Sequence, residues 1–148
     1  MAEFQQKGFD QLTATELFEI YRIRVAVFVV EQDCAYQEVD DLDSHAQHLF
    51  TRDAAGHITA YARLIDEGQQ VRIGRVLVAP ANRGNGAGRR LVQAALTAAE
   101  RTYPAATAIV IQAQAYLQDF YASFGFQPTS AIYLDTGIPH LDMVLPRQ

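Results

Sequence analysis

The sequence contains one cysteine, one lysine and no tryptophan. A single cysteine, Cys34, excludes an internal disulfide framework and a cysteine-rich zinc site. No apolar run approaches the length of a membrane span, and the first residues lack the apolar core of a signal peptide, so we expect a cytoplasmic protein that binds no membrane. The net charge of -5 argues against nucleic acid as a partner, because such surfaces carry clustered basic side chains.

What the chain does have is an ordinary globular composition, with 49% hydrophobic and 20% charged residues. At 148 residues it is long enough to bury one hydrophobic core. No linker, repeat or low-complexity tract divides it. We therefore expect a single domain over residues 1–148.

Three glycines fall within residues 84–88, between Arg83 and an amphipathic helix, and this segment carries the clearest functional signal. The preceding residues 71–78 are rich in β-branched side chains and end near Pro80, which predicts a strand. A helix that begins after such a turn leaves backbone N–H groups without intrahelical partners, and these groups attract phosphate. The sequence therefore predicts a phosphate-bearing ligand at this turn.

The spacing of these glycines excludes two familiar nucleotide sites. In the dinucleotide fingerprint Gly-x-Gly-x-x-Gly, the third glycine would fall at Arg89 when counted from Gly84, and no glycine stands at the required position when counted from Gly86. A Walker A loop needs a Gly-Lys pair, and the only lysine is Lys7. A tight connection without a ligand is the alternative that the residues leave open.

The rest of the chain alternates helices and strands. Thr13 and Glu16 form a capping box, which predicts a helix up to about Val30. The pattern after the glycine turn predicts a second helix with one buried face, and a shorter helix is expected from about Tyr116 to Gly125. Further strands are expected at residues 47–52, 58–65, 108–112, 129–134 and 140–145.

The apolar run at residues 108–112 is typical of a strand buried on both faces. Because it follows a crossover helix, we expect it to lie parallel to the strand at residues 71–78. Gly74 within that earlier strand indicates a bulge or the close approach of another backbone. A gap between two parallel strand ends beside a helix N-terminus is a crevice in which such sheets bind ligands.

The pattern Arg-Gly-x-Gly-x-Gly after a strand ending in Val-x-Val-x-Pro resembles the acyl-CoA pyrophosphate loop of the GNAT superfamily of N-acetyltransferases. The motif positions are matched by Arg83, Gly86 and Gly88. Residues 114–126 resemble a second motif of the family, with Gln114 in the place of its usual Asn. The segments at residues 24–32 and 137–140 resemble those of the small bacterial ElaA-type branch of this superfamily.

The resemblance implies a fold of the α+β class with three α/β layers, the acyl-CoA N-acyltransferase fold. Its mixed central sheet would have six to seven strands, a splayed parallel pair and about four flanking helices. The acyl donor would be acetyl-CoA, with no metal, and the acceptor a primary amine of a small molecule or peptide. The implied donor-binding residues are Val76, Leu77, Val78, Arg83, Gly84, Asn85, Gly86, Ala87, Gly88, Arg89, Gln114 and Tyr121.

The same resemblance makes Tyr121 the acid that protonates the leaving thiolate, and a phenol with a pKa of about 10 is protonated at neutral pH. Phe120, Tyr121 and Phe124 also form an aromatic stripe at helical spacing, so core packing is the alternative. Many family members have an acidic residue near the position of Arg75, and this chain does not. The candidates for the general base are Asp43, His45, His48 and, as the two we favour, Glu31 and His140.

Six carboxylates lie within residues 31–43, and no Lys or Arg falls between Arg24 and Arg52. This asymmetry predicts either steering of a cationic amine toward the acceptor side or a solvated acidic loop. The leading hypothesis is an N-acetyltransferase. A non-catalytic acyl-CoA-binding or sensing module and a structural interaction domain without a ligand are the alternatives, and a homodimer through an edge strand is left open.

Overall fold

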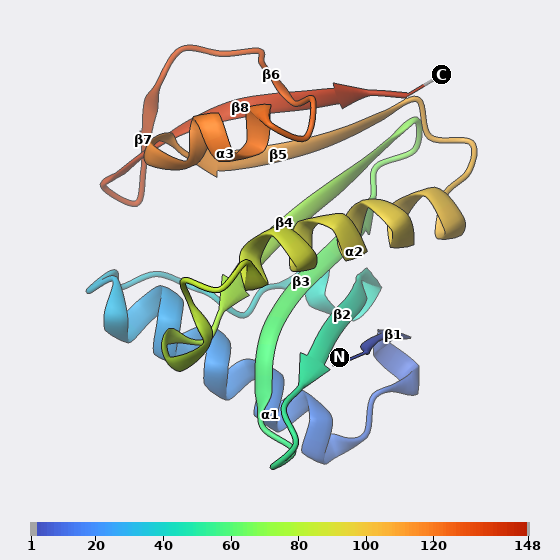
Figure 1. Cartoon of the computed structure of the whole chain (residues 1–148), viewed down its shortest axis with the longest axis vertical. Coiled ribbons are helices and arrows are strands. Elements are labelled where there is room, and N and C mark those ends of the chain that lie inside the picture. The colour runs from blue at the N-terminus through green and yellow to red at the C-terminus, as the bar shows by residue number, and fades with distance from the viewer. Residues whose placement is uncertain (1–2, 148) are drawn as a thin grey trace.

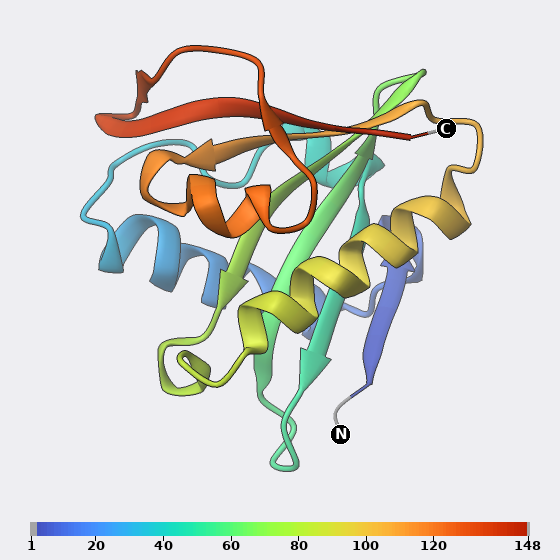
Figure 2. The same cartoon turned by 45° about the horizontal axis from the view of Figure 1, so that its top comes forward.

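The computed structural model describes residues 3–147, which form an eight-stranded mixed sheet with helices on both faces (Figures 1 and 2). The strand order is β1-β2-β3-β4-β5-β8-β6, and β7 pairs with β8. This agrees with the predicted α+β class. The sheet has more strands than the six to seven expected, because it includes two very short strands, β6 and β7. The strands are β1 (Phe4–Gly8), β2 (Gln47–Arg52), β3 (Ile58–Asp66), β4 (Gln70–Val78), β5 (Ala108–Gln114), β6 (Gln127–Pro128), β7 (Tyr133–Asp135) and β8 (Ile138–Pro146).

Within the described residues there are three α-helices, where about four were expected: α1 (Ala14–Val25), α2 (Ala87–Thr102) and α3 (Gln118–Ala122). The predicted capping box opens α1. The Thr13 hydroxyl accepts from the Glu16 N–H at 3.0 Å, and the Glu16 carboxylate accepts from the Thr13 N–H at 2.9 Å. The helix continues without a break as the π-helical segment η2 (Ala26–Glu31), so its predicted end near Val30 is confirmed.

The two long helices pack on opposite faces of the sheet (Figure 2). On one face, Leu91 and Val92 of α2 belong to the main core with residues of β3, β4, β5 and β8. On the other face, Ile20 of α1 packs with Phe50 and Leu77. Among the described buried residues packed with α1, none comes from β5 or β8. The face of β5 and β8 that points away from α2 is therefore left uncovered by α1.

The parallel strands β4 and β5 pair only at one end. Residues 70–72 pair with residues 108–110, after which the strands diverge (Figure 1). From Ile73 to Val78, no described strand pairs with β4 on the β5 side. The predicted parallel pair and the gap beside it are confirmed.

A β-bulge lies in β4 beside Gly74, as predicted. Arg75 and Val76 of β4 stand opposite one residue of β3, Ala62. Arg75 adopts a left-handed conformation with φ of 51°. For a residue with a side chain this costs on the order of 1 kcal/mol, so neighbouring contacts must hold it there.

Two strand predictions differ from the structure. The prediction that residues 108–112 are buried on both faces is wrong: Ile109 and Ile111 are buried, whereas Gln112 is exposed. The reason is that α2 covers one face of β5, and no helix within residues 3–147 covers the other. The single strand expected at residues 129–134 is replaced by β6 and β7, which pair with different parts of β8.

Candidate active site

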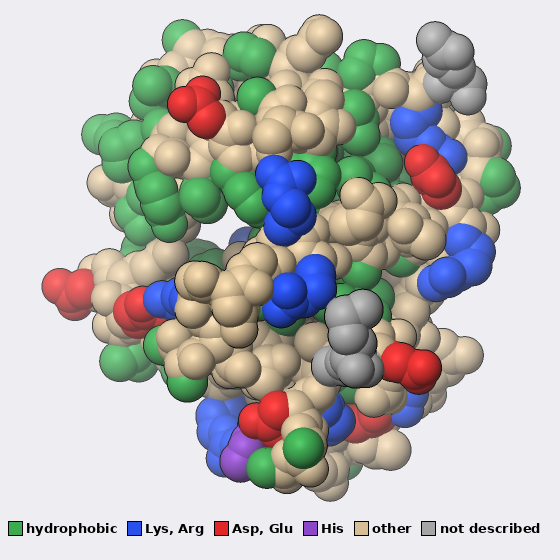
Figure 3. Space-filling view, in the orientation of Figure 1, with side chains coloured by type: hydrophobic (Ala, Val, Ile, Leu, Met, Phe, Trp, Pro, Cys, Tyr) green, Lys and Arg blue, Asp and Glu red, His purple; other side chains and the backbone are tan. Residues whose placement is uncertain are grey.

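A cavity of about 880 Å³ occupies the gap where β4 and β5 diverge, and its opening is visible in Figure 3. A volume of this size is typical of small-molecule sites. Its walls come from η2, β4, the glycine turn, β5, α3 and β8. The predicted site residues that line it are Glu31, Val76, Leu77, Val78, Arg83, Gly84, Gly88, Gln114, Tyr121 and His140. The others lie on the adjoining turn and the first turn of α2, outside the cavity wall: Asn85, Gly86, Ala87 and Arg89.

The glycine turn has the backbone that a phosphate site requires. Gly84 and Gly86 have φ of 87° and 81°, a region that residues with a side chain rarely adopt. Gly86 is the N-cap of α2, and no side chain caps the first N–H groups of the helix. These donors and the positive end of the helix dipole are therefore available to an anion.

An ion pair joins the turn to the end of η2. Arg83 donates from Nη1 and Nη2 to the Glu31 carboxylate at 2.6 and 2.9 Å, and from Nε to the Val78 carbonyl at 2.9 Å. The hydrogen bond from Arg83 lowers the pKa of Glu31. Glu31 is therefore held as a carboxylate beside the cavity mouth, with a reduced tendency to take up a proton.

Tyr121 both packs in the aromatic core and lines the cavity. Its ring is 6% exposed and packs edge-on against Phe120 and Phe126, with centroids 5.2 and 5.9 Å apart. Yet Tyr121 lines the cavity, and its hydroxyl is partly accessible and has no hydrogen-bond partner among the described residues. Burial raises the pKa of Tyr121 to about 12, which keeps the phenol protonated at neutral pH.

His140 on β8 is held in one tautomer. Its Nδ1 lies 2.7 Å from the Ile138 carbonyl oxygen. Because a carbonyl only accepts hydrogen bonds, Nδ1 carries the proton in the neutral ring and Nε2 keeps a lone pair. The ring stacks on Tyr133 with an interplanar angle of 22°, which fixes its orientation. His140 therefore lines the cavity with Nε2 as the ring nitrogen that is free of the bond to Ile138.

The other candidates for the general base lie outside the cavity lining. His48 is fully buried, with Nδ1 2.6 Å from the Tyr61 hydroxyl and Nε2 2.9 Å from the Asp43 carbonyl oxygen. Burial lowers the pKa of His48, so the ring stays neutral. Asp43 is 1% exposed and His45 lies on the same 3-10 turn, η3 (Asp41–His45), away from the cavity.

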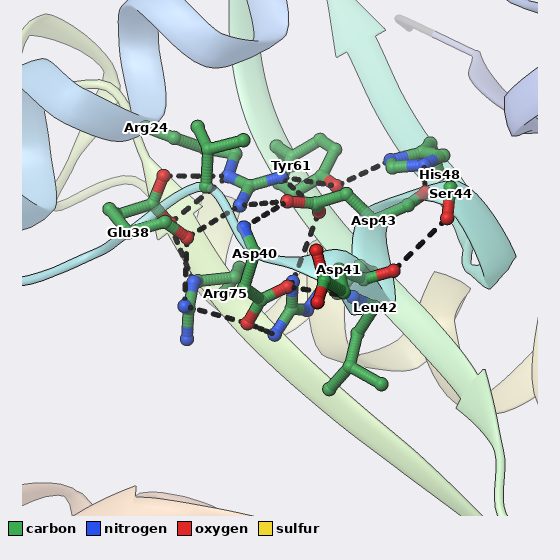
Figure 4. Close-up of polar contacts among 12 residues, drawn as sticks. Arg24, Glu38, Asp40, Asp41, Leu42, Asp43, Ser44, His48, Tyr61 and Arg75 are labelled. Carbon is green, nitrogen blue, oxygen red and sulfur yellow. Dashed lines mark hydrogen bonds and ion pairs between the residues drawn. The ribbon is translucent and has the colours of Figure 1, made fainter.

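Asp43 belongs to a buried ion cluster that the sequence did not reveal (Figure 4). We define the ion cluster as Arg24, Glu38, Asp40, Asp43, Arg63 and Arg75. Arg24 donates from Nη1 to Asp43 at 2.6 Å and from Nε to Glu38 at 3.1 Å. Arg63 donates from Nη1 to Asp40 at 2.7 Å. Three arginines thus balance three carboxylates.

The ion cluster also accounts for Arg75. Its Nη2 donates to the Glu38 carbonyl at 2.9 Å, its Nε donates to the Glu38 carboxylate, and its guanidinium lies 5.6 Å from the centre of the Tyr36 ring. These contacts hold the left-handed conformation at the bulge. They also bring the carboxylate of Glu38 to the part of β4 where the sequence lacks an acidic residue.

This arrangement corrects both interpretations for half of the acidic stretch, whereas Asp33 and Asp41 are exposed. Three of its six carboxylates, Glu38, Asp40 and Asp43, pair with arginines from α1, β3 and β4, so they form neither a solvated loop nor a free negative field. The pairing was hidden in the sequence because the arginines come from three separate elements. No spacing rule connects them.

Three smaller points limit the chemistry. Within residues 3–147, no group of three or more His, Cys, Asp or Glu side chains is placed to hold a metal ion. None of the helices described is long and apolar enough to cross a membrane. Cys34 is buried, and its thiol contacts the Thr136 carbonyl at 3.5 Å, so it is a packing residue.

The splayed parallel pair, the glycine turn before α2 and the cavity between them define a protein of the acyl-CoA N-acyltransferase fold. The chain belongs to the GNAT acetyltransferase family, because residues 4–146 match the family described as "Acetyltransferase (GNAT) domain". Acyl transfer from acyl-CoA is the chemistry of this family.

Its relatives place it beside ElaA. It is 49% identical over 144 residues to a UPF0039 protein of Schizosaccharomyces pombe, which covers 97% of this chain and 96% of that protein. It is 38% identical over 148 residues to protein ElaA of Escherichia coli, covering 97% and 95%. A crystal structure of an acyl-CoA N-acyltransferase from Pseudomonas aeruginosa is similar over the whole of both chains, with 40% identity and a TM-score of 0.92. The predicted fold and the resemblance to the ElaA-type branch are confirmed.

Proposed function

We propose that the protein is an N-acetyltransferase that transfers an acetyl group from acetyl-CoA to a primary amine of a small molecule or peptide, by direct attack in a ternary complex. One observation carries the proposal. A single cavity joins the unpaired edge of β4, the glycine turn and the hydroxyl of Tyr121. Donor, acid and acceptor can therefore meet without a covalent acyl-enzyme.

The donor would bind along β4 and across the glycine turn. The pyrophosphate fits the N–H groups of residues 84–88, beside the positive charge of Arg89. The pantetheine arm fits the unpaired edge of β4 as an additional strand, with its amides bonded to the backbone of residues 76–78. Gln114 faces this arm from the diverging strand β5.

The chemistry needs two proton transfers. The neutral amine attacks the thioester carbonyl carbon, the new C–N bond forms and the C–S bond breaks as the tetrahedral intermediate collapses. The proton lost by the nitrogen goes to the base, and the Tyr121 phenol gives its proton to the leaving thiolate. The products are the amide and free CoA, and Tyr121 regains a proton from solvent. The backbone N–H near Val78 would donate to the oxyanion.

His140 suits the role of base better than Glu31. The hydrogen bond to Ile138 leaves His140 Nε2 with a lone pair on the cavity wall, whereas Arg83 occupies both oxygens of Glu31. His140→Gln should reduce kcat by roughly 100-fold or more, as expected for loss of a general base. Glu31→Gln should leave kcat within about threefold and mainly change the KM for acetyl-CoA through Arg83. The reverse pattern would make Glu31 the base.

The direct test is release of free thiol from acetyl-CoA in the presence of polyamines, amino acids, aminoglycosides and peptides. Tyr121→Phe should lower kcat by roughly 100-fold or more with CoA binding retained in calorimetry. Tyr103→Phe removes a hydroxyl from a half-buried tyrosine at the end of α2 and serves as the matched control. Unchanged turnover in Tyr121→Phe would exclude Tyr121 as the acid.

A second function is favoured by Arg75. Where many family members have an acid, this chain has an arginine already paired with Glu38, which is consistent with a non-catalytic acyl-CoA-binding or sensing module. Tight CoA binding without turnover of any amine would favour it. No heat and no thermal shift with CoA would overturn both functions and leave a structural interaction domain.

A further inference from the structure

We infer that the acceptor is an amine with a carboxylate close by, as in a free amino acid, and this inference rests on the proposed acetyl transfer. The charges on the cavity wall carry it. The chain as a whole has a net charge of -5. The cavity, in contrast, is lined by four arginines and two carboxylates: Arg63, Arg72, Arg75, Arg83, Glu31 and Asp135.

Glu31 and Arg83 neutralise each other at the donor end. The remaining arginines, Arg63, Arg72 and Arg75, therefore face the acceptor part of the cavity with one carboxylate, Asp135. The carboxylates that pair with these arginines are Glu38, Asp40, Asp43 and Glu67, and none of them lines the cavity. The guanidinium side of each pair is thus the side that a ligand meets.

Each of these guanidiniums keeps one nitrogen outside its ion pairs. Arg72 contacts Glu67 through Nε and Nη2, at 2.7 and 3.3 Å, and Nη1 takes no part. Arg75 uses Nε and Nη2 and likewise leaves Nη1. Arg63 is 4% exposed, and its Nε is the one buried side-chain polar atom without a hydrogen-bond partner among the described residues. Because this N–H is itself buried, the guanidiniums that a ligand can reach are those of the partly exposed Arg72 and Arg75.

The opposite wall suits the amine. Gln112 on β5 and His140 on β8 alternate with residues buried under α2 and α3, so they share the open face of two neighbouring strands, across the gap from Arg75 on β4. Asp135 follows on the β7–β8 hairpin. The arginines of β3 and β4 are cationic, whereas His140 on β8 and Asp135 on β7 can accept a proton or pair with a cation. The two walls together match a zwitterion. Its carboxylate would meet the arginines and its amine would meet His140.

A planar carboxylate is the anion that we infer because guanidinium N–H groups pair well with its two in-plane oxygens. A polyamine would place a second cation among the arginines and would be repelled. This reverses the steering of a cationic amine that the sequence suggested. The difference is testable with amines that are matched except for the carboxylate.

The experiment measures kcat/KM for thiol release with two matched sets: leucine, leucinamide and isopentylamine, and lysine with cadaverine. The carboxylate-bearing member of each set should be at least about tenfold better, as for loss of a charge-assisted hydrogen bond. Equal or faster turnover of the amines that lack a carboxylate, or of spermidine, would overturn the inference while acetyl transfer stands. CoA binding with no turnover of any amine would instead remove the proposed function.

Arg72→Gln tests the wall itself. It should raise the KM for the amino acid by roughly tenfold and leave the KM for acetyl-CoA unchanged. The ratio of kcat/KM between the amino acid and the matched amine without a carboxylate should fall. Arg72 is partly exposed and lies beside Glu67, so the variant should fold. Arg101→Gln is the control, because Arg101 lies on the exposed side of α2 and contacts Gln6. An equal change in both variants, or an unchanged preference in Arg72→Gln, would contradict the assignment.

Discussion

Arg24 donates from Nη1 to Asp43 at 2.6 Å, and the two side chains are 0% and 2% exposed. Arg24 comes from α1 and Asp43 from η3, so the pair joins the helix on one face of the sheet to the segment that leads into β2. Burial alone would lower the pKa of Arg24, but the hydrogen bond to Asp43 together with the charges of Asp43 and Glu38 outweighs it and raises this pKa. The guanidinium therefore stays charged inside the protein.

Removing one partner should cost far more than a surface ion pair. Arg24→Leu leaves Asp43 and Glu38 without their shared partner, which should lower the free energy of unfolding by about 3–5 kcal/mol. Arg101→Leu, on the exposed surface of α2, should change it by less than about 0.5 kcal/mol. Urea unfolding of both variants measures the difference. Similar stabilities would show that the ion cluster contributes little.

The lowered pKa of His48 makes the free energy of unfolding depend on pH. Its pKa is lowered in the folded protein by burial, so below the ordinary value of about 6.5 the unfolded chain binds a proton that the folded chain does not. This contribution is present in full above pH 6.5 or so and is lost as the pH falls toward the lowered value.

The measurement is the free energy of unfolding at pH 7.5 and 5.5 in the natural protein and in His48→Gln. The natural protein should lose more stability between the two pH values than the variant. The other histidines, His45, His57 and His140, are present in both proteins and cancel in the comparison. A steeper loss in His48→Gln would contradict the role of His48.

Tyr121 predicts the alkaline side of the rate profile. With its pKa raised to about 12 by burial, the phenol stays protonated far above neutral pH. If Tyr121 is the acid, kcat for thiol release should show no fall up to about pH 10, where an ordinary tyrosine would already be half ionised. A fall centred below pH 9 in a protein that is still folded by circular dichroism would argue against this assignment.

A substitution in the glycine turn should weaken CoA binding by more than backbone strain alone would. Gly86→Ala places a side chain at φ of 81° on the N-cap of α2, beside the proposed pyrophosphate. The Kd for CoA should rise by roughly tenfold or more, because the loss of one or two backbone hydrogen bonds to a charged phosphate costs at least about 1.5 kcal/mol.

Gly56→Ala is the matched control for this variant. Gly56 has φ of 90° with open space around it, in the turn between β2 and β3, so it carries the same strain away from the cavity. Both variants should lose similar stability in thermal unfolding, and only Gly86→Ala should lose affinity for CoA in calorimetry. An equal loss of affinity in both would show that strain alone acts.

Local patterns in the sequence predicted the two long helices, most of the long strands and the glycine turn, but not β1. The capping box at Thr13, the β-branched run before Pro80 and the glycines at residues 84–88 each act within a few residues, so their physics is present in the chain order itself. The parallel pair and its gap followed from one topological rule about crossover helices. Tyr121 came from a motif and not from physics, since its aromatic neighbours fit core packing equally well.

The acceptor side was decided by the tertiary structure alone. The carboxylates of residues 38–43 look like a solvated charge run in the sequence, and only the fold brings Arg24, Arg63 and Arg75 against them. One face of β5 is exposed because α1 packs on β2, β3 and β4 and does not reach it. These outcomes come from contacts between residues far apart in the chain, where pairing and exposure are set by packing and not by spacing. The sequence determined most of the elements and the glycine turn proposed for the donor, and the fold decided which charged side chains line the cavity proposed for the acceptor.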